Sequence, residues 1–282
     1  MRVPTLIYES SVTRRTLTLA VLAAATSSPS RAMDGMMDKE LMAFSAISST
    51  ACICDPAKAA AAGPGSPYFS TISAALAAAP SGGEVIVRPG EYDERLVINR
   101  PVTLFASTGA VLCWKSNKPD EAAIDVDVDV DAAKGSVVSI SGLAVRHSSR
   151  AAQSYGIYVH SPSRSVKFQN CDVVSSSGSG IGVEGGNVTV LSCTIHDCKN
   201  HGVLYAGSGA TGRVKRCIIE KCKGSGLLLR NGASPTLSNN LIQSNGEYGA
   251  ALIDCRGVLL DDNDVVRNRK GAVNGRCAEV GA

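Results

Sequence analysis

Short apolar strands separated by turn residues begin near residue 85. Apolar and polar residues alternate there, with the apolar positions at Val85, Val87, Leu96 and Ile98 and turn residues at Pro89-Gly90 and Arg100-Pro101. Alternation with a period of two is the pattern of a strand that buries one face. The segment therefore predicts short strands joined by tight turns.

The same strand then returns with a regular period. Glycines that open an apolar strand recur every 22 to 24 residues, at Gly156, Gly180, Gly202, Gly226, Gly249 and Gly271. A period of this length is typical of solenoids, in which each repeat forms one turn that packs on the next. The sequence thus predicts an all-β fold, a right-handed parallel β-helix solenoid of about eight rungs.

Small polar residues form further columns in this register. One column is Cys171, Cys193, Cys217, Asn240 and Asn263, and a second, five residues later, is Ser176, Cys198, Cys222, Asn245 and Asn268. Aliphatic residues follow the first column by two positions, at Val173, Ile195, Ile219, Ile242 and Val265. Because parallel strands stack at roughly 4.8 Å, stacked Asn side chains can bond to one another as a ladder, and Cys fills the same volume as a small apolar residue. Stacked disulfides or metal binding are the alternatives for the cysteines.

A short helix is expected ahead of the strands. Ile72, Ala75, Leu76 and Ala79 share one helical face, Ser70 or Thr71 can cap its start, and Pro80 and Gly82 end it. Such a helix would cover the open N-terminal end of the solenoid core. Residues 67–282 are therefore assigned to the β-helix domain.

The segment before the domain has a different character. Arg14 and Arg15 precede an apolar run over residues 16–25, and Ser30-Arg31-Ala32 offers small residues for cleavage, so residues 1–32 are predicted to be a leader peptide. The run is too short for a transmembrane segment. Residues 33–66 are predicted to be a linker, with an Ala-, Gly- and Pro-rich end. A true leader would place the protein outside the cell or in a plastid lumen, and a false one in the cytoplasm.

Composition and charge limit the classes of partner that the protein is expected to bind. The 28 glycines and 4% aromatic residues suit a narrow core with many turns. Basic and acidic residues number 28 and 25 and are scattered, which argues against nucleic acid as a partner. The spacing of the ten cysteines does not match a structural zinc site, so we expect neither a cofactor nor a metal.

The repeat resembles that of the pectin-lyase-like right-handed parallel β-helix proteins. The resemblance rests on Asn240-Leu241-Ile242-Gln243-Ser244-Asn245 leading to Gly249, and on the entry segment Val85-Ile86-Val87-Arg88-Pro89-Gly90-Glu91-Tyr92. It implies the fold but no single activity, because that scaffold hosts lyases, hydrolases, esterases, epimerases and non-catalytic binders. The style of repeat is similar to the β-helix region of F-box-only proteins, although residues 1–66 show no F-box.

Candidate binding residues lie on the strands that follow the glycines. The first and third residues after each glycine should point inward, so the second and fourth should point outward. The fourth positions are His160, Glu184, Ala206, Arg230 and Ile253, and Tyr158 is a second position. Tyr158, His160, Glu184 and Arg230 are therefore the predicted ligand-binding residues. His160 and Glu184 as an acid/base pair, with Arg230 orienting an acidic substrate, is the catalytic alternative.

Three other motifs have simpler interpretations. The alternating run from Asp125 to Asp131 is expected to be an exposed or looped acidic segment, with Ca²⁺ binding as the alternative. Asn200-His201-Gly202 resembles the Gly-His-Gly of polygalacturonases but lacks their preceding aspartates, so a turn is expected. Asn187-Val188-Thr189 fits a glycosylation acceptor, which matters only in a secretory pathway.

The sequence thus favours a non-catalytic binding or scaffold module without catalytic residues. It would recognise a protein or an acidic polysaccharide along an exposed face of the solenoid, and a ubiquitin-ligase substrate adaptor is one form of this role. The alternative is a carbohydrate-active enzyme, a lyase, epimerase or hydrolase, that acts on an acidic polysaccharide.

Overall fold

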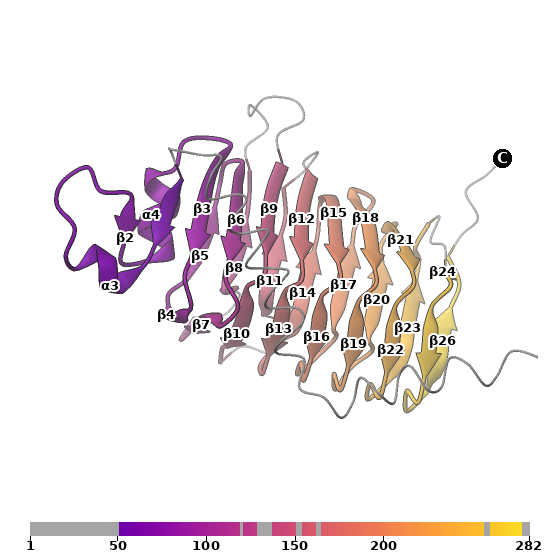
Figure 1. Ribbon diagram of the computed structural model, residues 1–282. Coiled ribbons are helices and arrows are strands. Elements are labelled where there is room, and N and C mark those ends of the chain that lie inside the picture. Colours follow the sequence, from indigo (N-terminus) through magenta and orange to yellow (C-terminus); the bar gives the residue numbers. More distant parts are fainter. Residues whose placement is uncertain are drawn as a thin grey trace, which may run out of the picture. The chain divides into compact units, whose positions relative to one another are not determined.

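The computed structural model describes residues 51–118, 121–128, 137–150, 154–161, 165–256 and 260–277. Three parallel sheets run through this part of the chain, and each strand pairs with the equivalent strand one turn away (Figure 1). This is the predicted right-handed parallel β-helix, and the chain winds along it from indigo to yellow in Figure 1.

From residue 83 onward, each turn contributes one strand to each sheet, and two earlier strands extend the first sheet. The first sheet contains ten strands: β1 (Cys52–Cys54), β2 (Tyr68–Phe69), β3 (Gly83–Val87), β6 (Val102–Ala106), β9 (Val137–Ser141), β12 (Ser165–Gln169), β15 (Gly186–Leu191), β18 (Ala210–Lys215), β21 (Ser234–Ser238) and β24 (Leu260–Asp261). The second contains eight: β4 (Gly90–Asp93), β7 (Ala110–Lys115), β10 (Ala144–Ser148), β13 (Asp172–Ser175), β16 (Thr194–His196), β19 (Ile218–Glu220), β22 (Leu241–Gln243) and β25 (Asp264–Val266). The third also contains eight: β5 (Leu96–Ile98), β8 (Ile124–Val126), β11 (Tyr155–Val159), β14 (Ser179–Val183), β17 (Val203–Ala206), β20 (Leu227–Arg230), β23 (Tyr248–Ile253) and β26 (Gly271–Gly275).

The predicted capping helix is α4 (Ile72–Ala78), which contacts β1, β3 and β5. The Thr71 hydroxyl accepts a hydrogen bond from the Ala74 amide at 3.1 Å, as an N-cap does. The Glu94 carboxylate accepts bonds from the amides of Ile72 and Ser73, and the Arg100 guanidinium donates to carbonyls at the other end of the helix. Both ends of α4 are thus tied to the first turn of the solenoid.

The solenoid begins before residue 67, although the sequence predicts residue 67 as its first residue. β1 lies in the first sheet between β2 and β3, with Cys52 opposite Val85 and Cys54 opposite Val87, and α3 (Pro56–Ala59) follows it. Cys52 and Cys54 are both buried, so they extend the inward column that the valines define. A strand of three residues is too short to show an alternation of apolar and polar positions. The prediction that these residues belong to a linker was therefore wrong. The predicted leader lies outside the described residues.

The corners of the solenoid are turned by single residues in the left-handed conformation. At the first corner these are Asn170, Ser192, Arg216, Asn239 and Asp262, with φ between 49° and 56°, each directly before an inward Cys or Asn. This conformation is costly for residues other than glycine. Here the backbone ladder continues through it, since the Ser192 amide donates to the Lys215 carbonyl at 2.9 Å. Continuous hydrogen bonding between turns therefore offsets the strain.

The inward columns fill the corners. The Asn240 amide nitrogen Nδ2 donates to Asn263 Oδ1 at 2.8 Å, and Asn245 Nδ2 donates to Asn268 Oδ1 at 2.9 Å. The same Oδ1 atoms accept backbone amides of the preceding turn, since the Asn240 amide donates to Asn263 at 3.1 Å and the Asn245 amide donates to Asn268 at 3.0 Å. The described cysteines of these columns are buried free thiols, so they pack as small apolar residues.

One member of the second column differs from the prediction. Ser176 was expected inside, but it is exposed, and Ser175 is buried in its place. Later turns insert a left-handed residue before the column, such as Asp197 before Cys198, whereas β13 runs straight into Ser175. The turn is one residue shorter, so the inward position moves back by one.

His147 occupies the second column one turn before Ser175. It is 3% exposed; its Nδ1 lies 2.9 Å from the Ser175 hydroxyl, and its Nε2 lies 3.0 Å from the Glu121 carbonyl. Burial lowers the pKa of His147 because the charged form loses its hydration. A neutral imidazole satisfies both contacts, with Nε2 donating and Nδ1 accepting.

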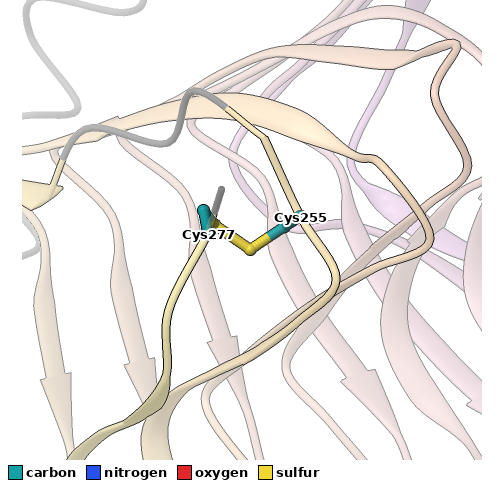
Figure 2. The surroundings of a disulfide bond; sticks show 2 residues. All are labelled: Cys255 and Cys277. Atoms are coloured by element: carbon teal, nitrogen blue, oxygen red, sulfur yellow. A yellow bond between two sulfur atoms is a disulfide. The ribbon is translucent and has the colours of Figure 1, made fainter. Parts of the chain in front are cut away.

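A disulfide ties the last described turn to the turn before it. Cys255 and Cys277 are joined across 22 residues with their Cα atoms 4.5 Å apart, and Cys255 is fully buried (Figure 2). Cys255 continues the column of Ala233, whose carbonyl accepts the Arg256 amide. The sequence offered disulfides only as an alternative for the stacked cysteines. The observed disulfide lies at a corner for which the repeat pattern predicts no column of cysteines.

Among the described residues, the structure contains no helix that is long and apolar enough to cross a membrane.

We predict that the protein loses stability as the pH falls from about 6.5 toward the lowered pKa of His147, because the unfolded chain takes up a proton that the folded chain excludes. His147→Asn, which keeps a polar column residue, should lose less stability than the wild type between pH 7 and pH 5. Urea unfolding at both pH values measures this. An equal loss in the two proteins would contradict the role given to His147.

We also predict that replacing both Cys255 and Cys277 with Ser lowers the free energy of unfolding by about 3 kcal/mol, the loop-closure value for a link of this length. Hydrogen exchange should accelerate in β26 and stay unchanged in β11. Cys113→Ser, which removes a half-buried free thiol, is the matched control. Equal exchange in β26 with and without the disulfide would show that the link does not hold the last turn.

Candidate functional site

The outer face of the third sheet carries the predicted binding residues. Tyr158 on β11 pairs in register with Asp125 on one side and Gly182 on the other, and the column continues to Leu204 and Leu228. Two positions further on, Ala206 pairs with Arg230, and Arg230 with Ile253. The outward columns therefore run as the spacing of the glycines predicts.

A pocket of about 490 Å³ lies on this face, across β11, β14, β17 and β20. Three of the four predicted residues line it, namely Tyr158, Glu184 and Arg230, whereas His160 is not part of its wall. The other lining residues are Ser154, Tyr155, Ser179, Asn200, His201, Leu204 and Leu228. The pocket thus combines two aromatic rings, an apolar floor and both signs of charge.

The aromatic part of the pocket is a stack on β11. The rings of Tyr155 and Tyr158 lie 5.0 Å apart and 6° from parallel, and the His160 ring lies 4.8 Å from the Tyr158 ring. The Tyr155 ring lies over Gly182 of the next strand, where a Cβ atom would come within 2.4 Å of Tyr155 Cδ1. The absence of a side chain at Gly182 therefore creates the space for the stack.

Glu184 is held by the stack. The Tyr158 hydroxyl donates to Glu184 Oε2 at 2.6 Å. Burial, followed by this bond to a carboxylate, raises the pKa of Tyr158, so the phenol remains a donor at physiological pH. The pair places one carboxylate at a fixed point beside the aromatic faces.

His160 contacts Asp125 and forms no bond to Glu184, so the contact on which the alternative acid/base pair depends is absent among the described residues. His160 Nε2 lies 3.0 Å from Asp125 Oδ1, and Asp125 Oδ2 accepts from Arg95 at 2.6 Å. Asp125 lies on β8 with its side chain only 20% exposed, so this part of the acidic run is neither looped nor fully exposed. Asp129 and Asp131 lie outside the described residues. No cluster suited to a metal occurs among the residues that are described.

Arg230 is the cationic group of the pocket. Its Nε atom is buried and has no hydrogen-bond partner among the described residues. A buried guanidinium N–H without a partner is unfavourable, so a rotation of the Arg230 side chain toward a ligand acceptor in the pocket would relieve this deficit.

His201 lies in the connection between β16 and β17, where the sequence predicts a turn, and it also lines the pocket. Its Nδ1 accepts the Ser225 amide at 3.0 Å, and burial is the main cause that lowers its pKa. The imidazole is therefore neutral at pH 7, with its proton on Nε2. His201 and Tyr155 each directly precede a column glycine, Gly202 and Gly156, and that position was the signal that could have identified both.

The comparison with protein families agrees with the fold. The family described as right handed beta helix region matches residues 130–280. Among solved structures, a pectate lyase, Pel9A, is 16% identical with a TM-score of 0.48; the match covers 77% of this chain and 64% of that one. The A-module of the mannuronan C-5 epimerase AlgE6 from Azotobacter vinelandii is 13% identical with a TM-score of 0.24, over 75% of this chain and 94% of that one. No curated protein matches the sequence. Neither structural likeness carries an argument about activity.

We predict that Gly182→Ala displaces the Tyr155 ring and destabilises the fold by about 1 kcal/mol, the lower end of overpacking costs, because the ring can rotate away. Near-ultraviolet circular dichroism should lose the signal of the stacked tyrosines. Gly209→Ala, where a Cβ atom meets nothing within 4 Å, is the control. An unchanged tyrosine signal in Gly182→Ala would mean that the stack does not depend on this glycine.

Proposed function

The chain belongs to the right-handed β-helix family, and on this scaffold we propose that the pocket of the third sheet binds an acidic polysaccharide without cleaving it. The observation that carries the proposal is the buried, unpartnered Nε of Arg230 beside the stacked Tyr155 and Tyr158. A uronic acid unit offers the matching groups: a carboxylate for the guanidinium and a ring whose C–H face packs on an aromatic face.

The other walls suit a sugar as well. Glu184 keeps one oxygen for ligand hydroxyls, because the structure shows the Tyr158 bond only at Oε2. Leu204 and Leu228 supply apolar contact at the floor. A volume of about 490 Å³ is typical of sites for small rings. A protein partner usually needs an interface of about 800 Å² on each side, so the pocket favours a glycan over a protein or a ubiquitin-ligase substrate.

A binding role is favoured over catalysis by the state of the titratable groups. The lone pair of His201 Nδ1 is already used by the Ser225 amide, so this histidine is a poor proton acceptor. His160 is bonded to Asp125, outside the pocket. Among the described residues that line the pocket, Glu184 is the only carboxylate, whereas hydrolysis of a glycoside generally needs two.

We predict that oligosaccharides of galacturonate or mannuronate bind, and that Arg230→Ala and Tyr158→Ala each weaken binding at least tenfold, which corresponds to about 1.4 kcal/mol. Arg213→Ala, which removes an exposed cation from β18 in the first sheet, should leave binding unchanged. Isothermal titration calorimetry with all four proteins measures this. Equal affinities in the wild type and Arg230→Ala would refute the site.

The same samples test the catalytic alternative. The proposal expects no new reducing or unsaturated ends after prolonged incubation with the polysaccharides. Ends that appear with the wild type and disappear with Arg230→Ala would instead identify the pocket as an active site.

A further inference from the structure

Asn187 lies on the outer face of the first sheet, away from the pocket of the third. It is the second residue of β15, and its side chain is exposed. No described residue forms a hydrogen bond or ion pair with its side chain. It is the first residue of Asn187-Val188-Thr189, which is the single Asn-x-Ser/Thr motif of the sequence. The middle residue is not proline, as glycosylation requires.

The neighbours of Asn187 leave room for a large substituent. In register it pairs with Ser165 on one side and Thr211 on the other, and Ser234 follows Thr211. All three are small, so none of these side chains would cover a group attached to the Asn187 amide.

Other asparagines of the repeat differ from Asn187. Asn240 and Asn245 are 2% and 1% exposed, and their amides hold the ladder between turns. Asn187 thus combines an acceptor motif with an exposed amide that the fold does not use.

The cysteines supply an independent observation about the compartment. Cys255 and Cys277 form a disulfide, which persists in oxidising compartments such as the endoplasmic reticulum and the cell exterior. The column thiols Cys171, Cys193, Cys198, Cys217 and Cys222 are each at most 2% exposed, so they are shielded from oxidants. An oxidising environment is therefore compatible with every described cysteine of the columns.

We propose that Asn187 is N-glycosylated in a secretory pathway. The Asn187 side-chain nitrogen forms a bond to the anomeric carbon of an oligosaccharide carried on a lipid diphosphate. The bond from that carbon to the diphosphate oxygen breaks, the diphosphate leaves on the lipid, and the amide loses one proton. The folded solenoid then carries the glycan on the first sheet, which contributes no residue to the pocket of the third sheet.

The test is expression of the whole chain, with its own residues 1–282, in a eukaryotic secretory host. The protein from the medium is compared before and after an enzyme that removes N-glycans, by gel mobility and by mass spectrometry of the peptide that contains Asn187. We expect one glycan, lost completely in Asn187→Gln and in Thr189→Ala. Thr189→Ser is the matched control, because it keeps the hydroxyl of the motif and should keep the glycan.

Two outcomes overturn the proposal. One is a secreted protein with the Cys255–Cys277 disulfide but no glycan on Asn187. The other is a chain that remains in the cytosol, unmodified and with both cysteines reduced. Neither outcome affects the pocket, since saccharide binding is measured separately and Asn187 lies on a different sheet.

Discussion

Parallel pairing between successive turns, with a strand spacing of roughly 4.8 Å, determines where the side chains of this solenoid lie. The pairing puts equivalent residues above one another, so a residue that suits one turn suits the next. Ile195, Ile219 and Ile242 stack without exposure because each fits the layer below it. The same constraint forces the backbone through left-handed corners at residues such as Ser192 and Arg216, where the ladder of hydrogen bonds offsets the strain.

The outer face follows the same geometry, but its chemistry comes from departures from the repeat. Gly182 interrupts a column of side chains and admits the Tyr155 ring. Arg230 follows Ala206 in the column and brings a charge next to the apolar floor. Function in this fold therefore depends on positions where neighbouring turns differ, since a uniform face would offer no pocket.

The sequence predicts those features of the fold that depend on the regular length of the repeat. It identified the inward columns, the helix at Thr71 and the shared face of Tyr158, Glu184 and Arg230, because those turns are 22 to 24 residues long. It missed the Asp125–His160 contact, since these turns are longer and their register cannot be read from spacing. The burial of Ser175 was missed because the corner before it is shortened by one residue. The burial of Cys52 was missed because its strand has only three residues. His201 was missed because its importance comes from the rings and charges of other turns, not from its own motif.

The central claim is that the outer face of the third sheet holds an acidic sugar between an aromatic stack and the half-buried guanidinium of Arg230. A crystal structure of the protein with a uronate oligosaccharide tests it most directly. We expect a ligand carboxylate within hydrogen-bond distance of Arg230 and a sugar ring against Tyr155 or Tyr158. A ligand bound on the first or second sheet, with Arg230 Nε still unpartnered, would contradict the account.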